Sequence, residues 1–347
     1  MMLPTPSELA ARARADLRVG LPVAIGGVVL ASVETLSVER LAAMDAAGPL
    51  VLAVTARRAE TLRARAYDGD LARIEVPSGA DTAWLRAVAD PARDLDLPMK
   101  GPLVTCRDDT AGPWRDGLRL AKGAELLPAV VGVEMPAPEG ITVLPVGAII
   151  GHDPAPRAVA AARVPLEVHR AGRVHVFRER GGGTEHSAVE IGQVDRAAPV
   201  LVRLHSACFT GDVLGSVKCD CGPQLHAALE AMARESGILL YLQQEGRGIG
   251  LANKMRAYDL QDQGFDTVEA NHRLGFEDDE RDLRLGAGLL RRLGVARIRL
   301  MTNNPRKIDV LRAEGIEVVE RVPLRVGRRT ENAGYLDVKR AKSGHLE

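Results

Sequence analysis

Three cysteines lie close together in the second half of the chain and could bind a metal ion. Cys208, Cys219 and Cys221 fall within 14 residues, while the fourth cysteine, Cys106, lies far away in the sequence. Clustered thiolates favour zinc in a reducing compartment. Three protein ligands leave one position on zinc for water or substrate, as in catalytic zinc sites. The spacing therefore predicts one catalytic zinc ion per chain, with Asp220 and Gly222 forming a tight turn around the Cys-X-Cys pair.

A structural zinc site is the alternative, because His205 or His226 could supply a fourth ligand. Two disulfides are also possible with four cysteines, but a chain of this length can bury a full core without them. A zinc nucleobase deaminase is excluded, because its His-X-Glu and Pro-Cys-X-X-Cys signature is absent.

The segments around and after the cysteines resemble the GTP cyclohydrolase II family. The resemblance rests on four blocks in the same order: HSACFTGDVLGSVKCDCG (205–222), QQEGRGIGLANKMRAYDLQDQGFDTVEAN (243–271), GFEDDERD (275–282) and TNNPRK (302–307). It implies hydrolytic opening of the imidazole ring of GTP, with release of formate and pyrophosphate. The product is a diaminopyrimidinone ribosyl phosphate, and the reaction is the first step of riboflavin synthesis.

The resemblance also implies roles for individual residues. Tyr258 lies near the base, Asp279 accepts a proton, and Arg281 acts at the α-phosphate. An electrostatic role suits Arg281 better than a nucleophilic one, because a guanidinium pKa exceeds 12, but both stay open. The family's contacts to GTP correspond to Arg203, His205, Ser206, Gln224, Glu245, Gly246, Arg247, Thr267, Thr302 and Lys307. A magnesium ion on the triphosphate is expected from such chemistry.

Some of these assignments agree with the chemistry of the side chains. Glu245 could accept hydrogen bonds from the guanine N1–H and 2-amino group, and Arg247 suits bidentate phosphate binding. Lys307 follows a helix start, where backbone N–H groups favour anions. Two positions depart from the family pattern: Ala207 stands where many members have Glu, and Gln243 where Arg is frequent.

The hydrophobic patterns predict an α+β (mixed α/β) fold with two domains, the second having antiparallel strands and packed helices. We expect a first domain at 1–135, a linker at 136–164 and a catalytic domain at 165–347. In the first domain, Pro4–Val19 is predicted as a helix capped by Ser7. In the second, the segments 167–180, 181–194 and 199–207 alternate as antiparallel strands. Asn304 is predicted to cap a helix that has Pro305 at its first position and Gly315 just past its end.

Residues 14–134 more faintly resemble 3,4-dihydroxy-2-butanone 4-phosphate synthase, the usual fusion partner in riboflavin synthesis. That enzyme has an acidic metal-binding loop where this chain has GGVVLAS (26–32), and its His-Thr-Glu segment is also absent. Glu34 and Glu39 are the nearest acids and are expected at surface helix positions. Without carboxylates to hold magnesium, the first domain is predicted to be non-catalytic.

Composition limits the remaining classes of function. The 46 basic and 46 acidic residues balance, so the whole chain lacks the basic footprint of a nucleic-acid-binding protein. The uncharged stretch 19–33 is shorter than the roughly 20 residues of a membrane-spanning helix. Glu8 and Asp16 precede it, unlike the basic start of a signal peptide. We therefore expect a cytoplasmic hydrolase, and the family resemblance implies a homodimer.

Two alternatives to a GTP cyclohydrolase II stay open. The chain could be a nucleotide-binding regulatory paralogue without turnover, although the retained Cys, Tyr, Asp and Arg residues oppose this. It could also be a bifunctional riboflavin enzyme whose first active site has moved. An assay of the purified protein with GTP and magnesium separates these possibilities.

Overall fold

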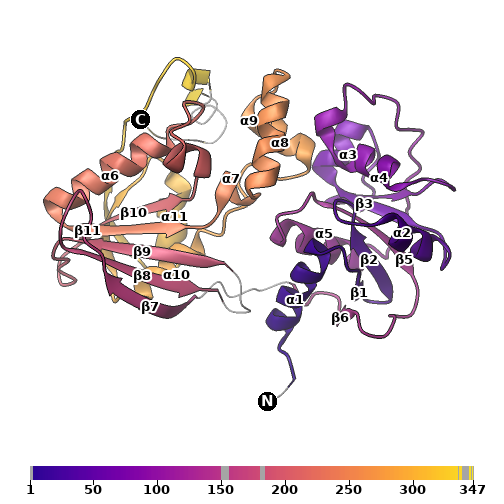
Figure 1. Cartoon of the computed structure of the whole chain (residues 1–347), viewed down its shortest axis with the longest axis horizontal. Helices are drawn as coiled ribbons and strands as arrows, with labels where there is room; N and C mark the ends of the chain where they lie inside the picture. The colour runs from indigo at the N-terminus through magenta and orange to yellow at the C-terminus, as the bar shows by residue number, and fades with distance from the viewer. Residues whose placement is uncertain are drawn as a thin grey trace. The chain divides into compact units, whose positions relative to one another are not determined.

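The computed structural model describes residues 3–149, 156–179, 184–334, 336–337, 344 and 346. The chain divides into two compact units, each built from one β-sheet and its helices (Figure 1). The first unit comprises Met1–His152 and Ile249–Glu280, and the second comprises Asp153–Gly248 and Arg281–Glu347. Both units mix helices with strands, which confirms the predicted fold class.

These units differ from a simple division of the chain at 136–164. Thr142–Leu144 forms strand β6 of the first sheet, and Arg157–Arg163 forms strand β7 of the second. Residues 249–280 pack with the first unit, because Leu260, Leu274 and Phe276 share a buried cluster with Leu127. The part of the expected linker at 150–155 lies outside the described residues.

The first unit contains a six-stranded sheet in the order β4-β3-β5-β2-β1-β6. Neighbouring strands run antiparallel, except that β6 is parallel to β1. The bounds are β1 (Val23–Ile25), β2 (Val28–Ser32), β3 (Val51–Thr55), β4 (Leu71–Glu75), β5 (Ala129–Glu134) and β6 (Thr142–Leu144). Strand β2 is buried along its whole length, so the segment GGVVLAS supplies a core strand.

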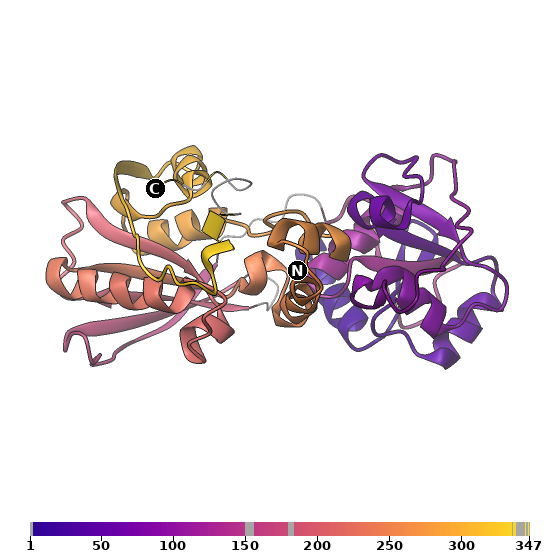
Figure 2. The same ribbon diagram turned by 90° about the horizontal axis from the view of Figure 1, so that it is seen from above.

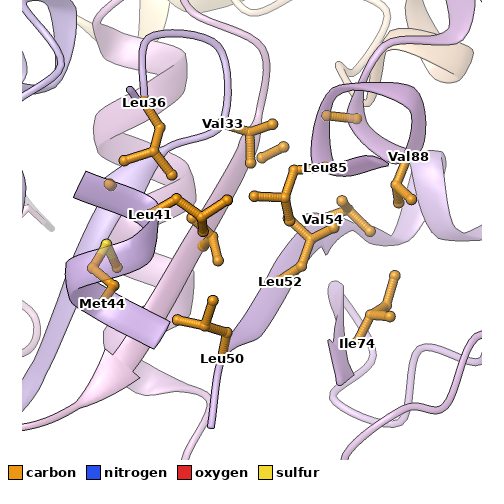
Figure 3. Packing of buried hydrophobic residues seen from close by; sticks show 14 of the residues in the cluster. Val33, Leu36, Leu41, Met44, Leu50, Leu52, Val54, Ile74, Leu85 and Val88 are labelled. Atoms are coloured by element: carbon orange, nitrogen blue, oxygen red, sulfur yellow. The ribbon is translucent and has the colours of Figure 1, made fainter. Parts of the chain in front are cut away.

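Helices cover both faces of this sheet. The helices of this unit are α1 (Pro6–Arg18), α2 (Val38–Asp45), α3 (Ala56–Leu62), α4 (Thr82–Ala89), α5 (Gly112–Gly123), α8 (Leu251–Asp262) and α9 (Thr267–Leu274). Of these, α8 and α9 pack against each other, and α9 packs against α3. One buried cluster joins α2 and α4 to the strands, and Figure 3 shows Leu41 and Leu85 meeting Leu52 and Val54 there. A second cluster joins α1 and α5 to residues that point to the opposite face.

Two local predictions in this unit are wrong. Helix α1 is capped by Thr5 instead of Ser7, because Thr5 and Glu8 form a reciprocal capping box with Pro6 in the first helical position. Glu34 lies in the turn before α2, not on a helix. There its carboxylate accepts a hydrogen bond from the Leu127 N–H at 2.8 Å and pairs with Arg256. Glu39 lies in the first turn of α2 and is exposed, as expected.

The second unit contains a seven-stranded mixed sheet in the order β13-β12-β10-β11-β9-β8-β7. Its strands are β7 (Arg157–Arg163), β8 (Gly172–Arg178), β9 (Glu185–Ile191), β10 (Val200–Ser206), β11 (Gly237–Leu242), β12 (Arg297–Met301) and β13 (Glu317–Val322). Strands β7, β8, β9 and β11 pair antiparallel, while β10 is parallel to both β11 and β12. The antiparallel prediction for 199–207 is therefore wrong. A helix connects β10 to β11, and such a crossover returns the chain parallel.

The longer helices of the second unit are α6 (Cys221–Glu235), α10 (Arg284–Arg292) and α11 (Pro305–Ala313), and the short α7 (Glu245–Gly248) also belongs to it. Met232 of α6 packs with Leu201 and Leu239 in one cluster, whereas Leu289 of α10 packs with Val202 in another. Alternate residues of β10 therefore face different helices. In the view turned by 90°, each unit again keeps its own sheet and helices (Figure 2).

Helix α11 begins as predicted. The Asn304 side chain accepts a hydrogen bond from the Arg306 N–H, Pro305 occupies the first position, and Gly315 follows with a φ of 82°. Within the described residues, no helix is both long and apolar enough to cross a membrane.

Candidate active site

Strand β10 carries the predicted site residues of its segment on two faces. Arg203 and His205 share the face of Leu201, which packs against α6. Ser206 follows on the other face and accepts a hydrogen bond from Arg281 Nη1 at 3.2 Å. A short π-helical turn, Phe209–Val213, then leads the chain towards the start of α6. This connection contains all three clustered cysteines.

The structure brings the three cysteine sulfurs together. All three Sγ atoms lie within 4.8 Å of one another, and those of Cys208 and Cys219 are 3.7 Å apart. Tetrahedral zinc with Zn–S bonds of ~2.3 Å places its sulfur ligands about 3.8 Å apart. Cys208 and Cys219 are buried and Cys221 is half-buried. The donor set and spacing therefore fit a zinc ion with three thiolate ligands.

Among the described residues, no histidine or carboxylate ligand atom joins this group of three sulfurs. His226 is exposed on α6, and His205 Nε2 is hydrogen-bonded to Asp212 at 3.0 Å. The alternative of a four-ligand site completed by either histidine is therefore not supported by this geometry.

Because Gly211 has no side chain, the space beside its Cα is open to the cysteine sulfurs. A Cβ atom added there would lie 2.7 Å from Cys219 Sγ and 3.0 Å from Cys208 Sγ. Such distances are well inside ordinary van der Waals contact. The absence of a side chain at Gly211 thus lets the turn pass directly beside the cysteine cluster.

Asp212 holds the cysteine loop to the sheet, although it is not among the site residues predicted from the sequence. Its carboxylate accepts hydrogen bonds from the backbone N–H of Cys208 at 3.0 Å and from Tyr241 Oη at 2.9 Å. It also bonds His205 Nε2, and its side chain is 3% exposed. The available signal was its place at the end of the TGD sequence, four residues after Cys208, but the side chains of His205 and Tyr241 that it bonds lie on two different strands.

Burial shapes the protonation of the groups around Asp212. It lowers the pKa of His205 below its ordinary value, which favours the neutral ring. Burial and then the Asp212 charge raise the pKa of Tyr241, so the phenol keeps its proton. In the described part of the chain, His205 Nδ1 is a buried nitrogen without a hydrogen-bond partner.

Arg203 and Gln224 connect β10 to the first turn of α6. Arg203 Nη2 donates to Gln224 Oε1 at 2.5 Å, and Gln224 Nε2 donates to Asp220 Oδ2 at 2.5 Å. Arg203 Nη1 donates to the Met301 carbonyl at 3.0 Å. Burial lowers the pKa of Arg203 to about 10, which leaves it charged at neutral pH. In this arrangement, both ends of the Gln224 amide are engaged within the protein.

The turn EGRG, assigned as the short helix α7 (Glu245–Gly248), has an unusual backbone. Gly246 and Arg247 have φ values of 62° and 64°, in the left-handed region that non-glycine residues seldom adopt. Glu245 Oε2 accepts a hydrogen bond from the Phe209 N–H at 2.6 Å, which ties this turn to the cysteine loop. Backbone held in this way often marks functional sites.

Thr302 and Lys307 lie at the end of β12 and the start of α11. Thr302 Oγ1 accepts a hydrogen bond from the Asn304 N–H at 3.0 Å. Lys307 is buried and donates from Nζ to the Leu204 carbonyl at 2.7 Å. Both residues therefore lie in the second unit with the cysteines.

Three predicted site residues belong to the first unit and are described with it. Tyr258 is half-buried on α8, with Lys254 Nζ 5.6 Å from its ring centroid. Thr267 is the first residue of α9, and Asp279 follows that helix. The second unit thus brings together the zinc-ligand candidates and the remaining contact residues, while these three lie outside it.

The fold and the cysteine cluster define a mixed α/β protein with a candidate zinc centre. Residues 157–323 match the family model described as GTP cyclohydrolase II. A GTP cyclohydrolase-2 from Azospirillum brasilense is 42% identical to this chain over 96% of it and 93% of the relative. The Escherichia fergusonii GTP cyclohydrolase-2 is 58% identical over 49% of this chain and 86% of the relative. The chain therefore belongs to the GTP cyclohydrolase II family, and its prediction as a hydrolase is confirmed at that level.

A solved structure of a two-domain 3,4-dihydroxy-2-butanone 4-phosphate synthase from A. baumannii also matches. It covers 93% of this chain and 100% of that chain, with 17% identity and a TM-score of 0.31. A TM-score this low does not indicate a shared fold for either unit.

Proposed function

We propose that this chain is a zinc-dependent GTP cyclohydrolase II that opens the imidazole ring of GTP. Formate and pyrophosphate leave, and the diaminopyrimidinone ribosyl phosphate of riboflavin synthesis remains. The observation that carries the proposal is the meeting of three cysteine sulfurs within 4.8 Å in a member of this family. When bound, zinc would supply Lewis-acid activation of water near neutral pH for attack at C8 of guanine.

The chain's own residues hold and orient the reacting groups in this proposal. Cys208, Cys219 and Cys221 hold the metal. Tyr258 donates a proton during ring opening, and Asp279 accepts one. Arg281 stabilises charge at the α-phosphate, consistent with its hydrogen bond to Ser206 beside the cysteine loop.

The substrate contacts follow the same proposal. Glu245 recognises the guanine edge, because a carboxylate can accept hydrogen bonds from the guanine N1–H and 2-amino group. Its bond to the Phe209 N–H holds it beside the cysteine loop. Arg247 binds phosphate through its planar guanidinium group. The remaining contacts are Arg203, His205, Ser206, Gln224, Gly246, Thr267, Thr302 and Lys307. Magnesium accompanies the triphosphate, because Mg²⁺ is commonly bound through substrate phosphates.

We also propose that the enzyme acts in the cytoplasm as a homodimer, without nucleic-acid or membrane partners. Residues 1–135 are proposed to be non-catalytic, because β2 is a fully buried strand where a magnesium-binding acidic loop would be needed. Domain boundaries at 1–135, 136–164 and 165–347 remain our proposal for the functional division of the chain.

The test combines metal analysis with turnover. Purified protein is incubated with GTP and magnesium, and formate and the ultraviolet change of the ring-opened product are measured. Cys219→Ser should lose zinc and product formation together. The matched variant Cys106→Ser should keep its zinc, because Cys106 lies outside the cluster. Product formation that survives complete zinc removal would contradict the proposal.

A further inference from the structure

A cavity of about 660 Å³ lies in the first unit, at the β4 edge of its sheet. The segment 103–108 forms one wall, where Cys106 N–H donates to the Arg73 carbonyl and Thr105 bridges to Ile74. The chain that follows α3, from Arg63 to Tyr67, forms another wall. None of these residues belongs to the zinc or GTP site proposed above.

Three arginines line this cavity, and two of them gather around one aromatic ring. The guanidinium carbons of Arg107 and Arg65 lie 4.8 and 5.5 Å from the ring centroid of Tyr67. Arg63 is the third. Its φ of 56° is in the left-handed region, where glycine is usual at the end of a helix.

These arginines differ from the neighbouring Arg73 in their charge pairing. Arg73 is buried and pairs with Asp68 at 2.9 Å and Asp108 at 2.6 Å. Within the described chain, by contrast, Arg63, Arg65 and Arg107 form no salt bridge. Among the described residues, the cavity therefore contains three guanidinium groups that no salt bridge engages.

The acidic side chains of the lining offset this positive charge only in part. Asp108 is engaged by Thr110 and Arg73, and these hydrogen bonds hold its pKa below the ordinary range. Glu75 is the other carboxylate of the lining. The three lining arginines outnumber the two lining carboxylates, so the lining keeps an excess of positive charge that favours anions.

We propose that this cavity binds a phosphorylated small organic molecule. Guanidinium groups match the geometry of phosphate oxygens and bind them bidentately. The volume lies in the range of small-molecule sites and far exceeds that of a bare phosphate. Leu103 and Val104 add apolar surface to the same lining, which suits the carbon part of such a ligand. This site would give the first unit a binding function without butanone phosphate synthase chemistry.

Cys106 provides a reporter for this cavity alone. Its thiol lines the cavity and is half-buried, and burial raises its pKa, so alkylation is best followed at mildly alkaline pH. The full-length protein is treated with iodoacetamide, and modification of the Cys106 peptide is followed by mass spectrometry. Ribose 5-phosphate and inorganic pyrophosphate are the two probes, with sodium chloride of equal ionic strength as the reference.

We expect at least one phosphate probe to slow alkylation of Cys106 in a saturable manner. Protection by ribose 5-phosphate alone assigns the site to phosphate monoesters, and protection by pyrophosphate assigns it to diphosphates. Arg65→Gln and Arg107→Gln should each weaken the protection about tenfold or more, as expected for a charge-assisted hydrogen bond. Arg93→Gln is the matched control, because Arg93 is 73% exposed and lies outside the cavity.

Three results would overturn the proposal. They are absence of protection by both probes, equal protection by sodium chloride, and undiminished protection in the double variant of Arg65 and Arg107. The readout requires no turnover of GTP, so it is independent of the proposed catalytic function.

Discussion

Gly211→Ala tests whether the cysteine cluster is shaped for a metal ion. The added Cβ would lie 2.7 Å from Cys219 Sγ and 3.0 Å from both Cys208 Sγ and Cys221 Cβ. Ordinary contacts between heavy atoms need about 3.5 Å or more, so each of these is short by roughly 0.5–0.8 Å. Because zinc would fix the sulfur positions, none of them can rotate away without distorting a Zn–S bond.

The expected loss follows from this overlap. Disturbing the surroundings of metal ligands typically weakens metal binding about 10–100-fold, or roughly 1.4–2.8 kcal/mol. Overpacking a closed site costs a similar ~1–3 kcal/mol. Since the new methyl group meets both buried sulfurs, we expect the loss of zinc affinity in Gly211→Ala to lie near the upper end of this range.

The assay is competition for zinc with a chromogenic chelator, together with urea unfolding of the metal-free and zinc-loaded protein. Gly334→Ala is the matched control, because a Cβ there meets nothing within 4 Å and the φ of Gly334 is not positive. Gly211→Ala should release zinc more readily than wild type, while Gly334→Ala should not. Wild-type zinc affinity in Gly211→Ala would refute this reasoning. A loss of stability of the same size in metal-free and zinc-loaded protein would show a clash unrelated to the metal.

Three further outcomes are expected. Tyr258→Phe should retain GTP binding, measured by equilibrium dialysis, while formation of the ring-opened product collapses; a near-normal rate would show that the phenol is not needed. Asp94→Asn should lower the free energy of unfolding by about 3–5 kcal/mol in urea titrations, because Arg58, 1% exposed, loses its carboxylate partner. Burial alone would raise the pKa of Asp94, but its bonds to Arg58 and Lys100 lower the pKa overall. The stabilisation by the ionised carboxylate therefore holds above about pH 4. In more acidic solution the difference in unfolding free energy between Asp94→Asn and wild type should narrow. The intact protein with ribulose 5-phosphate and magnesium should form no four-carbon phosphate, and turnover that Glu34→Ala abolishes would reveal a relocated site.

Structural features that depend on a few neighbouring residues could be predicted from the sequence. The three cysteines needed only their spacing to be predicted as candidate metal ligands, and Asn304 with Pro305 specified the start of α11. The family followed from long, ordered blocks of residues, which the relatives confirm. Thr5 shows the limit of such signals, because Ser7 is an equally good capping residue and the choice depended on the reciprocal bond to Glu8.

Features that depend on distant segments could not be predicted. Strand β10 alternates like an antiparallel strand, but the crossover through α6 makes it parallel to β11. Asp212 gains its importance from Tyr241 and His205, which lie on two different strands. The arginine-lined cavity joins segments about 40 residues apart in sequence, from the end of α3 and from 103–108. None of these pairings leaves a periodic or local pattern.

In the proposed function, zinc held by the three cysteines is required to open the imidazole ring of GTP. The most direct test of this requirement is a titration of zinc into metal-free protein with GTP and magnesium present, with formate release as the readout. We predict that the rate rises with added zinc and stops rising at one zinc ion per chain, whereas Cys219→Ser stays inactive throughout. Formate release that is independent of zinc, or no formate at saturating zinc, would contradict zinc-dependent ring opening by this protein.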